Sequence, residues 1–174
     1  MTQVEETVET LAAADAARFK RRFDWVDELA VETNLEVAYA YTSLMASFSR
    51  CLSKIGESRA HGRTKILRLL YLSEHERVPQ HEIGRQLGVT SANITYLIDG
   101  LEKEDLVRRV VNQQDRRVTF VELTEKGDKL SAELVPLIGE FMATTANSLT
   151  EAEKRQLIDL LVKFRTNSEA SYLD

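Results

Sequence analysis

Over most of the chain, apolar residues recur at about the 3.6-residue period of an α-helix, and glycine and proline are scarce. One expected helix carries Phe19 on its apolar face, and it could extend through a junction near Thr33 and Asn34. A second is expected from Leu35 to about Ile55, and further helices over residues 62–71, 124–141 and 150–164. The pattern predicts a mainly α-helical protein.

Two short stretches depart from this period because they alternate between apolar and polar residues and are rich in β-branched side chains. They cover residues 106–112 and 118–123, and the polar segment 113–117 between them has the sequence Gln-Gln-Asp-Arg-Arg. Alternation on both sides of a polar turn is typical of a β-hairpin. We therefore expect one small hairpin within a helical chain.

Residues 80–99 have the spacing of a helix-turn-helix. Ile83 and Leu87 would lie on one face of a first short helix, Gly88 would form the turn, and Thr90 or Ser91 would cap a second helix. The second helix has the i, i+3, i+4, i+7 stripe of a buried face, formed by Ile94, Leu97, Ile98 and Leu101. The same pattern also fits a plain helical hairpin inside an all-α core.

Small and hydrogen-bonding side chains lie off this stripe at the start of the second helix, which suits contact with base edges in a DNA major groove. A helix-turn-helix followed by a hairpin is a winged helix, and the tip here is Asp115-Arg116-Arg117. Arginine at such a tip can enter a narrow minor groove, and a neighbouring carboxylate can hold its guanidinium. The alternative interpretation is an ordinary charged turn.

The net charge of -5 at first argues against a nucleic-acid partner, because phosphate binding needs positive charge. The charge is unevenly distributed, however. Residues 1–36 carry -5, residues 37–117 carry +4, and residues 118–174 carry -4. The basic middle of the chain therefore remains compatible with DNA binding.

Several classes of protein are excluded by what the sequence lacks. Cys51 is the single cysteine, so neither an intrachain disulfide nor a cysteine zinc site is expected. The longest uncharged stretch, residues 37–49, is too short to cross a bilayer, and the N-terminus is acidic and polar. We expect a cytoplasmic protein without a membrane partner. No nucleophile elbow, phosphate loop or HExxH motif indicates an enzyme.

Two segments resemble a known family. DRRVTFVELTEKG, residues 115–127, resembles the Asp-x-Arg and Leu-Thr-x-x-Gly signature that ends the wing of MarR-type regulators. LGVTSANITYLIDGLEKEDLVRR, residues 87–109, resembles the recognition helix and first wing strand of that family. The resemblance covers about residues 35–164 and implies a homodimeric winged-helix transcription factor, usually a repressor, that binds a pseudo-palindromic operator in double-stranded DNA.

Carried over by position, the resemblance implies that Arg117 enters the minor groove, that Asp115 orients it, and that the recognition helix faces the major groove. The implied DNA-binding residues, including basic residues expected on phosphates, are Arg63, Arg85, Thr90, Ser91, Asn93, Thr95, Tyr96, Asp115, Arg116 and Arg117.

Three residues depart from the pattern of the family. Tyr96 and Gly100 stand where arginine is frequent, and Asp105 stands where glycine commonly begins a turn. Asp105 could be accommodated in a left-handed conformation, which Asp tolerates better than most residues. The first two departures remove positive charge, so phosphate contacts would depend more on Arg63, Lys65, Arg68, Arg85, Arg108 and Arg116.

The resemblance also implies the domain organisation. Residues 1–34 would be an N-terminal helical extension, residues 35–61 and 124–174 dimerisation helices, and residues 62–123 the winged helix-turn-helix lobe. The apolar faces outside the lobe exceed what one small core can cover, which favours a homodimer. Alternatively, these helices pack within one subunit.

Many members of this family bind a small, often aromatic or phenolic, anionic ligand between the dimerisation helices and the lobe. The residues that could line such a site here are Trp25, Tyr39, Tyr41, Phe48, Arg50 and Tyr71, although aromatic residues at helical spacing are also common in cores.

Other kinds of site have weaker signals. His61, His75 and His81 have no tight metal-ligand spacing, so we expect no metal site, and no cofactor is implied. Cys51 is expected to be a buried, uncharged thiol. The resemblance thus implies a DNA-binding repressor that is released by a ligand. The alternative is a winged-helix protein-interaction module without an effector.

Overall fold

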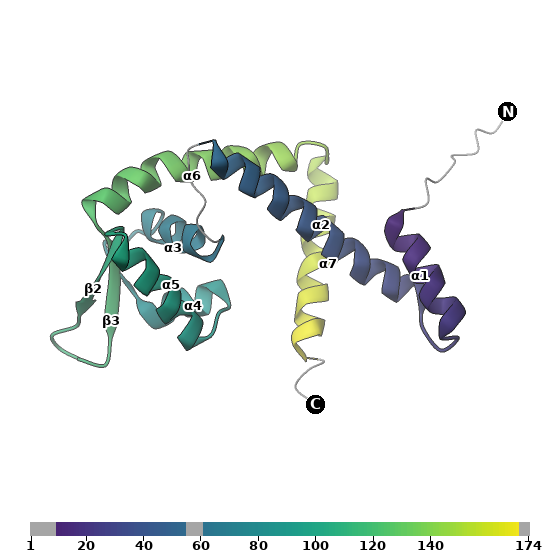
Figure 1. The fold of residues 1–174 in the computed structure, drawn as a ribbon, viewed down its shortest axis with the longest axis horizontal. Helices are drawn as coiled ribbons and strands as arrows, with labels where there is room; N and C mark the ends of the chain where they lie inside the picture. The colour runs from purple at the N-terminus through teal and green to yellow at the C-terminus, as the bar shows by residue number, and fades with distance from the viewer. Residues whose placement is uncertain (1–9, 55–60, 171–174) are drawn as a thin grey trace. The chain divides into compact units, whose positions relative to one another are not determined.

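The computed structural model describes residues 10–54 and 61–170, and it divides the chain into two compact units, residues 1–54 and 55–174. Both are drawn in Figure 1. The described residues form mainly helices, with one small sheet in the second unit. The predicted class, mainly α-helical with a hairpin wing, is confirmed.

The first unit is a pair of helices, α1 (Leu11–Arg22) and α2 (Glu28–Ser53), packed against each other. Ala12 and Ala16, which are fully buried, let the two helices approach closely. Each helix has a side-chain cap at its start, because Thr10 Oγ1 accepts from the Ala13 backbone N–H and Asp27 Oδ1 accepts from that of Ala30.

A helix does extend through the junction near Thr33 and Asn34, so the separate helix start expected at Leu35 is wrong. The break lies after α1, at residues 23–27, and α2 continues through Thr33 and Asn34. Both side chains donate hydrogen bonds to carbonyls four residues back, at 2.8 Å, so they remain inside the helix instead of ending it. The expected helix end at Ile55 and Gly56 lies outside the described residues.

The second unit contains a helical lobe, a sheet and two long helices. In chain order these are α3 (His61–Tyr71), β1 (Val78–Pro79), α4 (Gln80–Leu87), α5 (Ser91–Lys103), β2 (Val107–Val111), β3 (Thr119–Leu123), α6 (Glu125–Thr145) and α7 (Glu151–Ala170).

The predicted hairpin is β2 paired with β3, antiparallel, with Val107 opposite Leu123 and Val111 opposite Thr119. The sequence did not reveal β1, which pairs Val78 with Val121 on the other edge of β3. The sheet therefore has three strands in the order β1-β3-β2.

The core of the lobe is apolar and lies between α3, α4, α5 and the sheet. Its fully buried side chains include Ile66 and Leu67 of α3, Ile83 of α4, Ile98 of α5 and Val121 of β3. The expected recognition-helix stripe is buried at each of its four positions. Leu134 and Ile138 of α6 are also buried, and α6 packs on α3.

Short-range signals place the turns of the lobe. Gly88 ends α4 with a φ of 64°, and Asp105 begins the turn into β2 with a φ of 57°. Both are left-handed conformations, so the accommodation expected for Asp105 is confirmed. Gly127 is required by close approach, because a Cβ atom there would lie 1.8 Å from the Leu106 carbonyl oxygen.

Helices α6 and α7 begin at the predicted caps. Thr124 Oγ1 accepts from the Gly127 backbone N–H at 3.0 Å. Thr150 and Glu153 form a reciprocal capping box, in which the Thr150 backbone N–H donates to Glu153 Oε2 at 2.7 Å. These bonds lower the pKa of Glu153. Pro136 lies inside α6, which continues to Thr145.

Candidate nucleic-acid interface

The turn between α4 and α5 has the geometry expected of a helix-turn-helix. The Val89 backbone N–H donates to the Gly84 carbonyl at 3.1 Å, and Thr90 Oγ1 accepts from the Asn93 backbone N–H at 3.3 Å. A Cβ atom on buried Gly84 would lie 3.5 Å from Ile94 of α5, which shows how closely the helices pack. The alternative, a helical hairpin inside an all-α core, is excluded because β2 and β3 follow α5 as a wing.

The N-terminal half of α5 presents polar and aromatic side chains to solvent. Ser91, Asn93, Thr95 and Tyr96 are exposed, and Tyr96 is 69% exposed. The first-turn backbone N–H groups and the helix dipole at this end favour an anion. The side chains expected to face DNA are therefore accessible on this end of α5.

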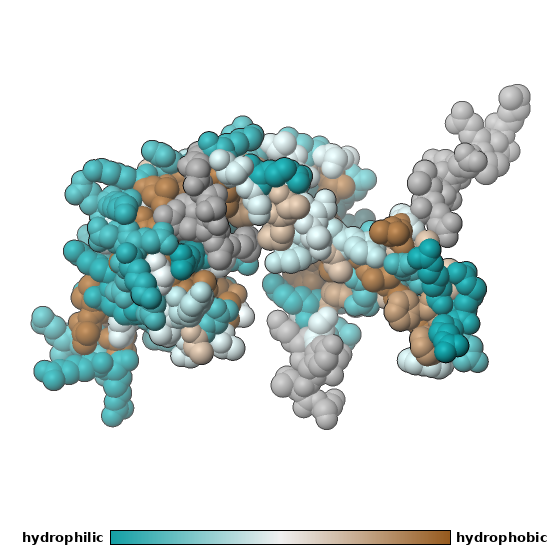
Figure 2. All heavy atoms as spheres, in the orientation of Figure 1, coloured by the Kyte–Doolittle hydropathy of each residue, from teal (hydrophilic) through white to brown (hydrophobic). Residues whose placement is uncertain are grey.

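The wing tip carries two exposed arginines. Arg116 and Arg117 form no ion pair within the part of the chain that the structure describes, so both guanidinium groups are available to phosphates. The tip lies in the hydrophilic region at the lower left of Figure 2.

Asp115 bonds to the backbone of Arg117 within the wing tip. Asp115 Oδ1 accepts from the Arg117 backbone N–H at 3.0 Å, and the carbonyl of Asp115 accepts from the Val118 N–H at 3.0 Å. In this structure the carboxylate therefore shapes the turn and positions the backbone of Arg117, and among the described residues it forms no ion pair with the guanidinium. A short side chain that bonds two residues ahead is an Asx-turn, which sequence position alone does not distinguish from an ion pair.

A cavity of about 260 Å³ lies between the helix-turn-helix and the wing. It is lined by Gln80, His81 and Arg85 from α4, by Ser91 from α5 and by Arg117 from the wing, among others. Predicted residues from three separate segments thus meet at one concave surface, which can accept a phosphate backbone.

Arg85 is partly neutralised by its neighbour on α4. Its Nη2 lies 2.6 Å from Glu82 Oε1 and its Nε lies 2.8 Å from Glu82 Oε2, a bidentate pair. The hydrogen bond from Arg85, followed by that from Gln86, lowers the pKa of Glu82 to about 2. Glu82 is consequently ionised at neutral pH, and Arg85 must exchange part of this pairing to bind a phosphate.

Arg63, an expected phosphate ligand, forms an ion pair with Glu104 in this structure. Its Nη1 lies 2.6 Å from Glu104 Oε1, and its side chain is only 22% exposed. The guanidinium lies over Gly100, where a Cβ atom would approach Nη2 to 2.1 Å. The absence of a side chain at position 100 therefore makes room for an arginine that comes from α3.

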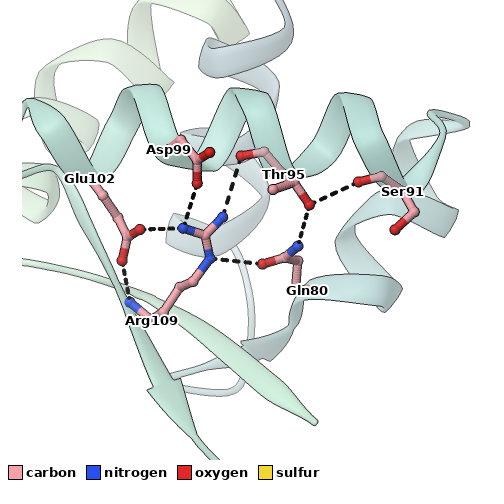
Figure 3. Close-up of polar contacts among 6 residues, drawn as sticks. All are labelled: Gln80, Ser91, Thr95, Asp99, Glu102 and Arg109. Atoms are coloured by element: carbon pink, nitrogen blue, oxygen red, sulfur yellow. Dashed lines mark hydrogen bonds and ion pairs between the residues drawn. The ribbon is translucent and has the colours of Figure 1, made fainter. Parts of the chain in front are cut away.

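Arg108 and Arg109 of β2 point to different partners. Arg108 is largely exposed, and its Nε lies 2.5 Å from Glu122 Oε1 on β3. Arg109 is largely covered and contacts Asp99 and Glu102 of α5 (Figure 3). Sequence analysis missed this cluster. The sequence feature that could have indicated it is the pair of carboxylates three residues apart on α5, followed by a strand with two arginines.

The residues expected to contact a ligand have varied surroundings. In the first unit, the Tyr39 hydroxyl donates to Asp15 Oδ2 at 3.2 Å, and desolvation together with this carboxylate raises the pKa of Tyr39. Phe48 is buried, whereas Trp25 and Tyr41 are exposed and do not line a closed cavity within that unit. Arg50 donates to Ser47 Oγ. In the second unit, Tyr71 is 37% exposed.

The described residues were expected to hold no metal ion and no membrane span. Among the described residues, no group of three or more His, Cys, Asp or Glu side chains is placed to hold a metal ion, and the His61 side chain lies outside that part. Cys51 is a half-buried free thiol. No helix in the described ranges is long and apolar enough to span a membrane.

Comparison with known proteins agrees with this geometry. The sequence profile of the MarR family matches residues 60–119, the helix-turn-helix and most of the wing. The chain is 30% identical over 136 residues to the uncharacterised HTH-type transcriptional regulator YkoM of Bacillus subtilis (strain 168), covering 73% of this chain and 87% of that protein.

Solved structures share the fold. S. aureus MepR in complex with DNA superposes with a TM-score of 0.65 at 23% identity, covering 75% of this chain and 96% of that one. NadR in complex with 4-hydroxyphenylacetate has a TM-score of 0.60 at 26% identity, covering 76% of this chain and 91% of that one.

The helix-turn-helix, the arginine-tipped wing and the similarity over most of the chain lead to one assignment. The protein is a DNA-binding transcriptional regulator and not an enzyme, and it belongs to the MarR family.

Proposed function

We propose that the protein is a homodimeric repressor that binds a two-fold symmetric operator and is released from it by a small aromatic or phenolic anion. The observation that carries the DNA-binding part is the shared surface formed by α5 and the wing. There, exposed Ser91, Asn93 and Tyr96 lie on a helix that can enter the major groove, while Arg117 lies at a tip that can reach the adjacent minor groove.

The phosphate contacts follow from the charges around this surface. Arg116 and Arg117 carry unpaired charge in the described part of the chain, and Arg85 shares its charge with Glu82. Few free cations give few released counterions, so binding should be salt-sensitive with a modest slope. Specificity then depends on placed side chains more than on net charge.

The homodimer is supported by the surface of α7. Five apolar residues on this helix are each 44–59% exposed, namely Leu157, Ile158, Leu160, Leu161 and Val162. Apolar area of this size on a regular helix is expected to be covered by a partner. A second copy also supplies the second recognition helix that a symmetric operator requires.

Effector release is supported by a relative. NadR was solved with 4-hydroxyphenylacetate, a phenolic carboxylate. The six expected ligand residues offer aromatic rings and a cation, Arg50, which are suitable for such an anion. These residues are the proposed ligand contacts.

The DNA-binding proposal is tested by selecting duplexes from a random-sequence pool with the wild-type protein. A two-fold symmetric consensus is expected, whereas a pool that stays random would contradict it. The dimer is tested by sedimentation, with twice the chain mass expected. Leu161→Lys should shift the protein toward one chain, and the control Lys163→Ala on the same helix should not.

The effector is tested on the complex of the protein with its selected duplex. Added 4-hydroxyphenylacetate should release the DNA in a saturable manner, and 4-methylphenol, which keeps the phenol but lacks the carboxylate, should not. Release by both compounds alike, or by neither, would contradict an anionic phenolic effector.

A further inference from the structure

Arg109 is the most extensively bonded side chain at the junction of the wing and the recognition helix (Figure 3). Its Nη1 donates to Asp99 Oδ1 at 2.7 Å and also to Glu102, and its Nη2 donates to the Thr95 carbonyl at 3.3 Å. Its Nε donates to Gln80 Oε1 at 2.9 Å. One guanidinium thus joins β2 to both helices of the helix-turn-helix.

Glu102 holds the backbone of the strand as well as the guanidinium. Its Oε1 accepts from the Arg109 backbone N–H at 2.9 Å while its Oε2 accepts from the side chain. This two-point contact fixes where β2 begins relative to the end of α5. The orientation of the wing is therefore coupled to that of the recognition helix.

Gln80 extends the cluster to the DNA-facing side of α5. It accepts from Arg109 with Oε1 and donates through Nε2 to Thr95 Oγ1 at 3.0 Å. Thr95 Oγ1 in turn donates to the Ser91 carbonyl at 2.9 Å. The hydroxyl proton of Thr95 is used within the helix, and an acceptor site on its oxygen is used by Gln80. This hydroxyl is consequently less able to read a base than the sequence predicted.

The charge balance gives the cluster a second effect. Asp99 and Glu102 would place two negative charges on the recognition helix, and Arg109 is the cation that contacts both. Asp99 is still 48% exposed. Arg109 therefore reduces the repulsion between α5 and DNA phosphates without itself needing to touch them.

We infer that Arg109 is a positioning residue for operator recognition, which fixes α5 relative to the wing through Asp99, Glu102 and Gln80. This inference rests on the proposed operator binding. Arg109 then affects the specificity of binding. The Thr95 hydroxyl bonds within the protein, and its methyl group is left free for base contact.

The test compares Arg109→Lys with Arg108→Lys. Both changes keep the charge and remove a guanidinium fork. Arg108 pairs with Glu122 of β3 and contacts no member of the cluster, whereas a lysine at 109 cannot satisfy the four acceptors of the Arg109 guanidinium. Affinity is measured for the duplex selected by the wild-type protein and for a scrambled duplex of equal length, over a range of salt concentrations.

Arg109→Lys should lower the ratio of specific to scrambled affinity about tenfold, the effect of losing one charge-assisted hydrogen bond, with the salt slope unchanged. Arg108→Lys should change this ratio less than about twofold. A ratio unchanged in Arg109→Lys, or equal losses on both duplexes, would overturn the inference. Thermal unfolding of each variant shows whether it is folded at the assay temperature.

Gln80→Ala is a second variant, and it leaves the sequence of β2 unchanged because Gln80 lies in α4. It should lower the specificity ratio, and the loss should not add to that of Arg109→Lys, because both act through one cluster. Full additivity would overturn the inference. If the wild-type protein selects no sequence, the proposed function itself fails, and this outcome is distinct from a selected site that Arg109→Lys still recognises.

Discussion

Replacement of Arg117 by alanine isolates the contribution of the wing to DNA binding. Its side chain is exposed and forms no ion pair in the described part of the chain, so its removal leaves no buried partner unsatisfied. The bond that shapes the turn uses its backbone N–H and Asp115, and this bond is retained in the variant. The stability of the fold should therefore change by less than about 0.5 kcal/mol.

Arg117→Ala should therefore weaken DNA binding and not the fold. A groove contact by arginine contributes about 1–3 kcal/mol, which corresponds to roughly 5-fold to 150-fold in affinity. Fluorescence anisotropy with the selected duplex at physiological salt measures this loss. The slope of log affinity against log salt should also fall by about one unit for the lost charge.

Arg116→Ala is the matched control, because it removes the same charge from the neighbouring position. It should reduce the salt slope similarly, but it should not alter the preference for A·T over G·C pairs beneath the wing, which a minor-groove arginine provides. Undiminished operator binding by Arg117→Ala would refute the wing assignment. Loss of A·T preference in both variants would refute the distinction between the two arginines.

Three further predictions concern stability and are checked by chemical or thermal unfolding. Gly127→Ala should destabilise the fold by about 3 kcal/mol, because its Cβ would lie 1.8 Å from the Leu106 carbonyl oxygen, and an unchanged midpoint would contradict this packing. Asp105→Gly should stabilise by about 0.5–1 kcal/mol, because glycine adopts the φ of 57° without the penalty of a side chain; a loss of stability would count against strain there. Glu82 has a pKa lowered to about 2, chiefly by Arg85, from its usual 4.5, so its stabilising contribution is complete above pH 4.5 and is lost as the pH falls toward 2. Glu82→Gln should lose stability above pH 4.5 and show a flatter acid dependence, and identical pH profiles of the two proteins would contradict the pairing.

Local signals made the lobe predictable from sequence. A glycine between two apolar stripes, a threonine at a helix start and alternation around a polar turn each depend on residues near in the chain. Gly88, Thr90 and Thr124 therefore indicated the correct turn and caps. Asp105 also fitted its predicted conformation because the constraint is confined to its own backbone.

Features that depend on tertiary contact were not predictable in this way. Strand β1 has two residues, one of them Pro79, and exists only by pairing with β3. Arg63 meets Glu104 across 41 positions, and Arg109 meets Gln80 across 29. A net charge computed from the sequence counts these arginines like those of the wing. In the fold, carboxylates pair with Arg63 and Arg109, whereas Arg116 and Arg117 form no ion pair among the described residues. The structure therefore brings predicted residues of α4, α5 and the wing to one surface, and it gives some of the arginines ion-pair partners that the sequence did not indicate.

The central claim is that one surface, made by α5 and the wing, binds DNA in a defined register. A hydroxyl-radical footprint of the wild-type protein on its selected duplex tests it most directly. The account predicts two protected half-sites related by a two-fold axis, with centres about 10–10.5 base pairs or a multiple apart, and flanking minor-groove protection that disappears in Arg117→Ala. Uniform protection without a register, or a flanking pattern that Arg117→Ala leaves intact, would contradict it.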